Sequence, residues 1–223
     1  MQDHIEHYLA PGRIVDSDHP AVQAFAAAAV AGKSGDREKA VALYYAVRDG
    51  FRYDPYSVDL EDAGLTGSGV LSKGHGWCVT KAALLTAACR AVGIPATVGY
   101  ADVKNHLSTE RMRQLLETEV FYWHGYSSIY IDGQWVKATP AFNLELCTRF
   151  KLLPLEFDGT QDSLYHPFDM AGNQHMEYVN HRGEFADVPA ASIREDFARY
   201  YPKMTQFKSA SFEQDSAQEA RKS

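Results

Sequence analysis

Two stretches in the first fifty residues carry apolar side chains at helical spacing. Residues 21–31 are rich in alanine, follow a candidate N-cap at Asp18 and end before Gly32, which are usual signals at the two ends of a helix. Residues 36–50 repeat apolar positions at close to 3.6 residues. The pattern therefore predicts one helix over each of these two stretches.

The helical pattern is then interrupted before a third helix begins. Residues 51–59 are aromatic and contain Pro55, so they predict a short strand or a turn. Residues 61–76 contain five glycines, which predicts a long loop. A helical pattern starts at Cys78 and ends at Gly93, two residues before a proline. Cys78 therefore falls in the first turn of a predicted helix.

The clearest strand signal is an antiparallel hairpin. Residues 120–131 and 134–139 flank Asp132-Gly133, a dipeptide that favours the type I′ turn of a two-residue hairpin. Because side chains alternate between the faces of a strand, one face is mostly apolar, and we expect it to point to the core. It consists of Trp123, Ser127, Ile129, Ile131, Val136 and Ala138. The other, more polar face consists of His124, Tyr126, Ser128, Tyr130, Trp135, Lys137 and Thr139.

Weaker signals complete the chain. Residues 96–103 have strand character, and residues 108–118 and 192–201 predict short helices. The stretch between residues 140 and 188 is rich in Phe, Tyr, His and Pro and predicts loops with some strand. Helices followed by an antiparallel hairpin indicate an α+β fold.

Composition and charge narrow the class of protein. The 223 residues are 45% hydrophobic and 23% charged, as in soluble globular domains. A net charge of −7 argues against nucleic acid or an anionic membrane as the main partner. The sequence shows no membrane-spanning apolar run and no secretory signal. Three cysteines without a CxxC pair predict neither a disulfide framework nor a zinc site. We therefore expect a cytoplasmic protein.

Cys78 and His124 are residue types that can act together in nucleophilic catalysis. A thiol attacks as the thiolate, and the free N–H groups of a helix N-terminus favour that charge and lower the thiol pKa. An imidazole on a rigid strand can serve as general base. The residues alone leave a second interpretation open, a small core cysteine and an ordinary strand histidine. Cys89 predicts core packing, and Cys147 has no distinguishing setting.

The hairpin register suggests partners for His124. With a two-residue turn, His124 lies opposite Ala141, and its diagonal neighbours on the same face are Thr139 and Asn143. Either side chain could orient an imidazole N–H, as the third member of a catalytic triad does. Neither side chain is the carboxylate that such triads commonly use.

The motifs that contain this cysteine and this histidine resemble those of the transglutaminase-like superfamily, which includes bacterial cysteine protease-like proteins. GWC at residues 76–78, followed by the run CRAVGIPATVGY, is similar to the block in which that family's nucleophilic cysteine opens a helix. HGY at residues 124–126, followed by DGQW at residues 132–135, is similar to the family's histidine block. DGFRYDPY resembles the aromatic segment ahead of the cysteine. The resemblance covers residues 41–140.

The resemblance implies a papain-like α+β fold in which the cysteine's helix packs on an antiparallel sheet that carries the histidine. It also implies cleavage, deamidation or cross-linking of amide bonds through a thioester, without a cofactor. Carried onto this sequence, it makes Cys78 the nucleophile and His124 the base. Tyr53 is the candidate oxyanion donor beside the backbone N–H of Cys78, and Trp77 either borders the substrate groove or packs in the core.

The sequence departs from the family at the position of the catalytic aspartate. That position, four residues after the hairpin tryptophan, holds Thr139, which can orient His124 but cannot stabilise an imidazolium by charge. Three outcomes stay open: Thr139 suffices, Asn143 or a downstream acid such as Asp158 replaces the aspartate, or activity is lost.

The resemblance also suggests how the chain is organised. Residues 1–208 are expected to form one transglutaminase-like domain, with its core at residues 41–140 and a C-terminal elaboration at residues 141–208. The polar residues 209–223 are expected to be a flexible tail.

Taken together, these features favour a cysteine-dependent enzyme that hydrolyses or transfers the acyl group of a protein, a peptide or a small amide. A non-catalytic binding module with the same fold is the alternative, because Thr139 replaces the aspartate. A metalloprotein is a third hypothesis, but the spacing of its candidate ligands matches no metal motif, and we expect no metal there. Those candidates are His166, Asp169, His175, Glu177 and His181.

Overall fold

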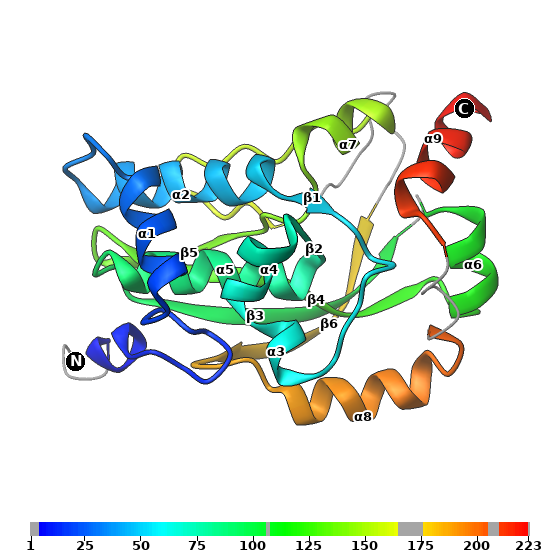
Figure 1. Ribbon diagram of the computed structural model, residues 1–223, viewed down its shortest axis with the longest axis horizontal. Helices are drawn as coiled ribbons and strands as arrows, with labels where there is room; N and C mark the ends of the chain where they lie inside the picture. Colours follow the sequence, from blue (N-terminus) through cyan, green and yellow to red (C-terminus); the bar gives the residue numbers. More distant parts are fainter. Residues whose placement is uncertain (1–4, 106–107, 165–175, 205–209, 223) are drawn as a thin grey trace.

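The chain folds into a four-stranded antiparallel sheet with helices packed on it (Figure 1). The computed structural model describes residues 5–105, 108–164, 176–204 and 210–222. The sheet has the strand order β5-β4-β3-β6, and β3 pairs antiparallel with both β4 and β6. The strands are β3 (Ala96–Asn105), β4 (Val120–Ile131), β5 (Gln134–Ala138) and β6 (Met176–Phe185). The predicted α+β class is confirmed.

Helix α5 (Cys78–Ala91) lies at the centre of the core. Every residue from Cys78 to Arg90 is buried, because α5 packs on the sheet and is covered by other helices. Those helices are α1 (Pro20–Ala29), α2 (Asp36–Gly50) and α4 (Gly67–Lys73). The many alanines of α5 let these elements approach closely, as the dense packing of a protein interior requires.

The remaining elements are short and surround this core. They are the 3₁₀ helix η2 (Glu6–Leu9), α3 (Asp62–Leu65), α6 (Glu110–Leu116), α7 (Leu144–Arg149), α8 (Ala190–Tyr200), α9 (Phe212–Lys222) and the parallel strand pair β1 (Arg52–Tyr53) and β2 (His75–Gly76). Among the helices that the structure describes, none combines the length and the apolar character needed to cross a membrane.

The structure confirms the main elements predicted from the sequence. α2 spans residues 36–50, and α5 begins at Cys78. β4 and β5 form the predicted hairpin, with φ of 50° at Asp132 and 87° at Gly133, as in a type I′ turn. The predicted apolar face of the hairpin is buried at all six positions, which are Trp123, Ser127, Ile129, Ile131, Val136 and Ala138.

The glycine-rich residues 61–76 are helical for most of their length, so the prediction of a long loop is wrong. Thr66 caps α4 by accepting a hydrogen bond from the N–H of Gly69 at 3.0 Å. Gly74 ends the helix in the left-handed conformation with φ of 71°. A Cβ at Gly67 would lie 3.1 Å from Cα of Leu84, so this glycine permits the close packing of α4 on α5.

The polar segment for which the sequence predicts a flexible tail contains helix α9. Phe212 at its start is buried, and its ring lies edge-on to the rings of Tyr53 and Tyr56, at centroid distances of 5.9 and 5.3 Å. Asp215 accepts hydrogen bonds from Tyr56 and Arg111. Helix α9 is thus attached by one buried aromatic residue and by polar contacts. Because it needs few apolar residues for this, its composition resembles that of a flexible tail.

Strand β4 crosses the first turn of α5 at Gly125. A Cβ atom at this position would lie 2.9 Å from the carbonyl oxygen of Cys78 and 3.0 Å from Cα of Val79. The absence of a side chain therefore lets the strand come this close to the helix. Farther along β4, the Ser127 hydroxyl donates to the carbonyl of Ala82 at 3.0 Å, which continues the contact along α5.

A buried lysine joins α5 to the segments before β1 and after β5. Lys81 is fully buried, and its Nζ donates to the carbonyl oxygens of Arg48, Phe51 and Ala141 at 2.9, 2.7 and 2.9 Å. Burial lowers the pKa of Lys81 to about 7. Three acceptors need three N–H donors, which the ammonium has and the neutral amine lacks, so we assign the charged form.

Replacing Lys81 by methionine should lower the free energy of unfolding by about 3 kcal/mol, because three buried carbonyl groups lose their donor. Urea denaturation of the two proteins measures this difference. The control Lys33→Met changes an exposed lysine and should alter stability by less than about 0.5 kcal/mol. Equal effects of the two substitutions would contradict the assigned role of Lys81.

A second prediction concerns the approach of β4 to α5. Gly125→Ala should lower the free energy of unfolding by about 1–3 kcal/mol, since its Cβ would overlap the first turn of the helix. The control is Gly50→Ala at the end of α2, where a Cβ meets no atom within 4 Å. It should leave stability unchanged or raise it by up to about 1 kcal/mol. Chemical denaturation that finds Gly125→Ala as stable as the parent would show that the contact is looser than described.

Candidate active site

Cys78 and His124 line the same cavity. Cys78 is the first residue of α5, His124 precedes Gly125 on β4, and their exposed fractions are 7% and 5%. The cavity has a volume of about 40 Å³ and is lined mostly by apolar side chains. These include three methionines and several aromatic residues, namely Met112, Met176, Met204, Tyr53, Trp77, Phe121, Tyr122, Phe142, Phe197 and Tyr201. The two residues that the sequence pairs thus border one small, largely apolar space.

The Cys78 thiol lies among backbone N–H groups of both elements. Burial raises its pKa to about 11, and hydrogen bonds from the N–H groups of Gly125 and Val79 act in the opposite direction. The N–H groups at the helix start lower this pKa as expected, but the expected net lowering is wrong, because loss of hydration outweighs them. A proton acceptor is needed if the thiolate is to form near neutral pH.

Trp77 both packs and borders the cavity. It is the N-cap residue of α5, and its ring lies 5.5 Å from that of Phe197 in α8. Its backbone N–H donates to the Thr80 hydroxyl at 3.0 Å. Its indole Nε1 is buried and meets no acceptor within the described part of the chain. Buried N–H groups without an acceptor are uncommon in protein interiors.

Tyr53 lies in the wall between this cavity and a second one. Its ring packs edge-on against Phe142, at a centroid distance of 4.8 Å, and burial raises the pKa of its phenol well above the usual value. The charge of a Cys78 thiolate raises that pKa further, so the phenol lies within electrostatic reach of the sulfur. This placement agrees with a role for Tyr53 near the nucleophile.

Two further tyrosines surround Cys78 and were not predicted from the sequence. The pKa values of Tyr100 and Tyr201 are raised by burial and also by the charge of a Cys78 thiolate. The Tyr100 hydroxyl is buried and has no hydrogen-bond partner among the described residues. Their positions depend on tertiary contacts between β3, α5 and α8, for which the sequence carries no local signal.

Thr139 is buried beside the end of β5. Its hydroxyl donates to the carbonyl of Leu164 at 2.6 Å, and its N–H donates to the carbonyl of Ser163 at 2.8 Å. The pairing of β4 with β5 ends at Ser127 and Ala138, so the ladder does not continue to the predicted opposition of His124 and Ala141. Thr139 bonds to Ser163 instead, and the next residue is a proline, which has no N–H to donate.

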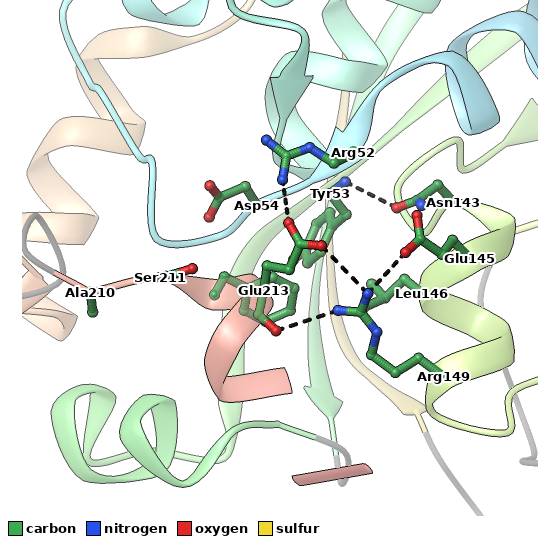
Figure 2. Close-up of a pocket in the computed structure, with 11 residues that line it drawn as sticks. Arg52, Tyr53, Asp54, Asn143, Glu145, Leu146, Arg149, Ala210, Ser211 and Glu213 are labelled. Atoms are coloured by element: carbon green, nitrogen blue, oxygen red, sulfur yellow. Dashed lines mark hydrogen bonds and ion pairs between the residues drawn. The ribbon is translucent and has the colours of Figure 1, made fainter. Parts of the chain in front are cut away.

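Asn143, the alternative third member, lies in a neighbouring pocket of about 240 Å³ (Figure 2). Its Oδ1 accepts the backbone N–H of Tyr53 at 3.1 Å. In the same pocket the Glu213 carboxylate pairs with Arg52 at 2.6 Å and with Arg149 at 3.7 Å. Asn143 therefore positions β1 through Tyr53.

Asp158, the downstream acid that could replace the aspartate, lies in an exposed turn. It accepts hydrogen bonds from the N–H and the hydroxyl of Thr160 at 2.8 and 2.7 Å. These bonds hold its pKa below the usual range. Its carboxylate serves the turn, as the sequence suggests for a solvated turn residue.

The other cysteines have structural surroundings. Cys89 is fully buried in α5, which confirms its predicted place in the core, and burial raises its pKa to about 12. Cys147 is buried in α7 and has its pKa raised to about 12 in the same way. Both are free thiols.

Three of the candidate metal ligands, His166, Asp169 and His175, lie outside the described residues. His181 is on β6, where its Nε2 lies 2.7 Å from the Tyr126 hydroxyl. Within residues 5–105, 108–164, 176–204 and 210–222, no group of three or more His, Cys, Asp or Glu side chains is placed to hold a metal ion.

The arrangement contains the groups that acyl transfer to sulfur requires. A thiol and an imidazole border one small, mostly apolar cavity, and a thiol with a base is the pair that thioester chemistry uses. The first N–H groups of α5 are hydrogen-bond donors of the kind that stabilise an oxygen that gains charge. The phenols of Tyr53 and Tyr100 add two more polar groups near the sulfur.

The overall fold is shared with a solved structure. A structure described as a putative cysteine protease from Cytophaga hutchinsonii aligns with a TM-score of 0.55 at 18% identity, over 86% of this chain and 50% of that chain. A putative protease from Parabacteroides distasonis aligns over 57% of this chain and 26% of that chain, with 17% identity and a TM-score of 0.38. The chain thus spans about half the length of the Cytophaga structure. Curated protein sequences give no significant match.

The likeness to the Cytophaga structure confirms the predicted arrangement of helices packed on an antiparallel sheet. The sequence profile of the transglutaminase-like superfamily matches residues 23–140, which is more than half of the chain and includes Cys78, His124 and Thr139. The chain therefore belongs to the transglutaminase-like superfamily.

Proposed function

We propose that this protein is a cysteine-dependent enzyme that cleaves or transfers the acyl group of an amide through a thioester. The observation that carries the proposal is the shared cavity of Cys78 and His124, with the N–H of Gly125 directed at the thiol. A family member with a nucleophile, a base and N–H donors at one point has the parts that this chemistry needs.

In the proposed reaction, Cys78 Sγ attacks the amide carbonyl while His124 accepts the thiol proton. The C–N bond then breaks, and His124 passes the same proton to the leaving nitrogen. Water or an amine attacks the thioester, gives its proton to His124 and releases the acyl group, and the proton returns to the sulfur. All electrons and protons are accounted for by the amide, the attacking water or amine, and these two side chains.

The oxyanion of the first step requires hydrogen-bond donors. The backbone N–H of Cys78 and the hydroxyl of Tyr53 are the proposed pair, because both residues line the cavity. In a cavity that excludes water, such donors stabilise charge more strongly than they do in solvent.

The raised pKa of Cys78 assigns a specific task to His124. A thiol with a pKa of about 11 is protonated at pH 7, so ionisation must be coupled to transfer of its proton to the imidazole. The low polarity of the cavity strengthens the attraction between thiolate and imidazolium. The enzyme therefore gains its nucleophile from the pair of groups and not from the helix N-terminus alone.

The cavity walls also indicate the kind of substrate. A larger hollow of about 560 Å³ adjoins the catalytic cavity and shares with it Val58, Phe197, Tyr201 and Met204. Because the two hollows share four lining residues, we propose that they bind neighbouring parts of one substrate. This supports a peptide or protein substrate with an apolar group next to the scissile amide.

Thr139 is the proposed third member. It follows β5, the hairpin partner of the strand that carries His124, whereas the polar groups of Asn143 and Asp158 serve β1 and a turn. Its hydroxyl donates to the carbonyl of Leu164, so the oxygen can still accept an N–H, and we propose that it accepts that of the His124 imidazole.

A binding module without catalysis is the second candidate. The threonine at the aspartate position favours it, because a hydroxyl cannot stabilise an imidazolium by charge. The small volume of the cavity also favours it, because little room is left for an amide beside the thiol. The reactivity of Cys78 separates the two functions.

Alkylation of Cys78 by iodoacetamide should depend on pH in two ways. The labelling rate should first rise near neutral pH, where His124 takes up the thiol proton. It should rise a second time toward pH 11, where the buried thiol ionises by itself. His124→Ala should remove the first rise, slow labelling at pH 7 by about 100-fold and leave the second rise. Mass spectrometry of labelled peptides gives the rate for each cysteine.

Cys89 and Cys147 are internal controls in the same experiment, because both thiols are buried with pKa values raised to about 12. An enzyme requires that Cys78 react faster than these two at pH 7. Labelling of all three at similar rates, with no effect of His124→Ala, would support the binding module.

Thr139→Val should slow labelling of Cys78 at pH 7 by about 3- to 10-fold, because the imidazole loses the group that orients it. The matched control is Thr148→Val in α7, which removes another hydroxyl that donates to a backbone carbonyl, that of Leu144 at 2.9 Å. A rate unchanged by Thr139→Val would remove Thr139 from the proposed site.

A further inference from the structure

The two proposed catalytic residues each directly follow a tryptophan, and both tryptophans contact helix α8. The ring of Trp77 lies 5.5 Å from the ring of Phe197. The indole Nε1–H of Trp123 donates to the carboxylate of Asp196 at 2.8 Å. Asp196 and Phe197 are consecutive residues of α8, so one turn of this helix touches the residue before the nucleophile and the residue before the base.

Trp123 has a costly backbone conformation. Its φ is 63°, in the left-handed region that bulky residues rarely adopt. The pairing of β3 with β4 shifts here, from Ala101 with His124 to Val103 with Phe121, which is a bulge. A bulge re-aims the neighbouring side chains. The direction of the His124 side chain therefore depends on the conformation of Trp123.

A largely buried network of charges holds Trp123 in this conformation. Asp102 accepts the backbone N–H of Trp123 at 3.1 Å. Arg182 donates to Asp102 at 2.5 Å and to Asp196 at 2.6 Å, and its guanidinium lies 4.4 Å from the centre of the Trp123 ring. Removing one member leaves a poorly hydrated charge without its partner, so the network resists rearrangement.

The end of α8 is tied to the same strand by a third contact. The hydroxyl of Tyr201 accepts the N–H of Tyr122 at 2.7 Å and donates to the carbonyl of Val120 at 3.0 Å. Arg182 on β6 and all of α8 lie beyond residues 23–140, the part of the chain that the family profile matches. The C-terminal part thus supports the family core at the point where β4 turns toward α5.

We propose that α8 is a clamp that fixes His124 relative to Cys78, with Asp196 and Phe197 as positioning residues and Arg182 as the link to β3. Asp196 holds the strand side through Trp123, and Phe197 holds the helix side through Trp77. The proposal rests on the proposed function, because it describes how the thiol and the imidazole are kept in register.

The clamp explains why a helix outside the family core contacts the site without supplying a catalytic group. Misplacement of reacting groups by about 1 Å can lower a rate by about 100-fold. A strained bulge held only by its own strand would relax and release His124. Support from a second rigid element prevents that relaxation.

The experiment compares Asp196→Ala with the matched control Glu195→Ala, which removes the exposed carboxylate of the preceding residue in α8. Iodoacetamide labelling of Cys78 at pH 7 should slow by about 10-fold or more in Asp196→Ala and by less than about 2-fold in the control. Asp196→Asn keeps an acceptor for the indole of Trp123 but loses the charge that pairs with Arg182. Phe197→Leu removes the ring that contacts Trp77. Both are used if Asp196→Ala does not fold, and both should slow labelling.

The same substitutions are then made in the His124→Ala protein. Asp196 acts through His124 in this proposal, so Asp196→Ala or Asp196→Asn should cause no further slowing when the imidazole is absent. Arg182→Lys, which keeps the charge between the two carboxylates, should retain more of the rate than Arg182→Gln. A general loss of structure would instead slow or speed labelling equally in both backgrounds.

Two results would overturn the clamp. One is a folded Asp196 variant that labels at the parent rate, and the other is an equal effect of the substitution with and without His124. Failure of the proposed function looks different, because His124→Ala alone would then leave labelling at pH 7 unchanged, and both proposals would fall together.

Discussion

The contact between Gly125 and the first turn of α5 is the constraint on which the site depends. It leaves no room for a side chain at residue 125, directs the N–H of that residue to the Cys78 thiol, and places His124 at the same cavity. The surrounding features stabilise one partner of this contact or the other. Lys81 ties α5 to three backbone carbonyls, and the network around Trp123 fixes the strand.

The closeness of these groups has an electrostatic consequence. The space between helix and strand is too small and too apolar to hydrate a thiolate, so burial raises the pKa of Cys78 despite its place at a helix start. The lost hydration must be replaced by an opposite charge when the thiol ionises, and His124 is the residue placed to supply it. Substrate binding would also displace any water that enters the cavity, and so favour the same pair.

Local sequence signals were sufficient for the elements that carry the site. The start of α5 at Cys78, the span of α2 and the Asp132-Gly133 turn follow from periodicity, capping and turn chemistry, and the structure has them where the pattern places them. The bulge at Trp123 was beyond such reasoning, since a strict period of two has no place for an extra residue. The contacts of α8 were also hidden, because Asp196 and Phe197 meet their tryptophans only through the tertiary fold. The prediction of a loop at residues 61–76 was wrong because it read the glycines as a sign of flexibility. Gly67 instead permits the close packing of α4 on α5.

The central claim is that Cys78 and His124 form one electrostatic unit. NMR titration of the His124 ring, in the parent protein and in Cys78→Ser, measures this coupling most directly. Charges within about 4–6 Å of each other shift each other's pKa values. The account predicts that the midpoint of the His124 titration moves by about one pH unit or more when the thiol is removed. Identical titration curves in the two proteins would contradict it.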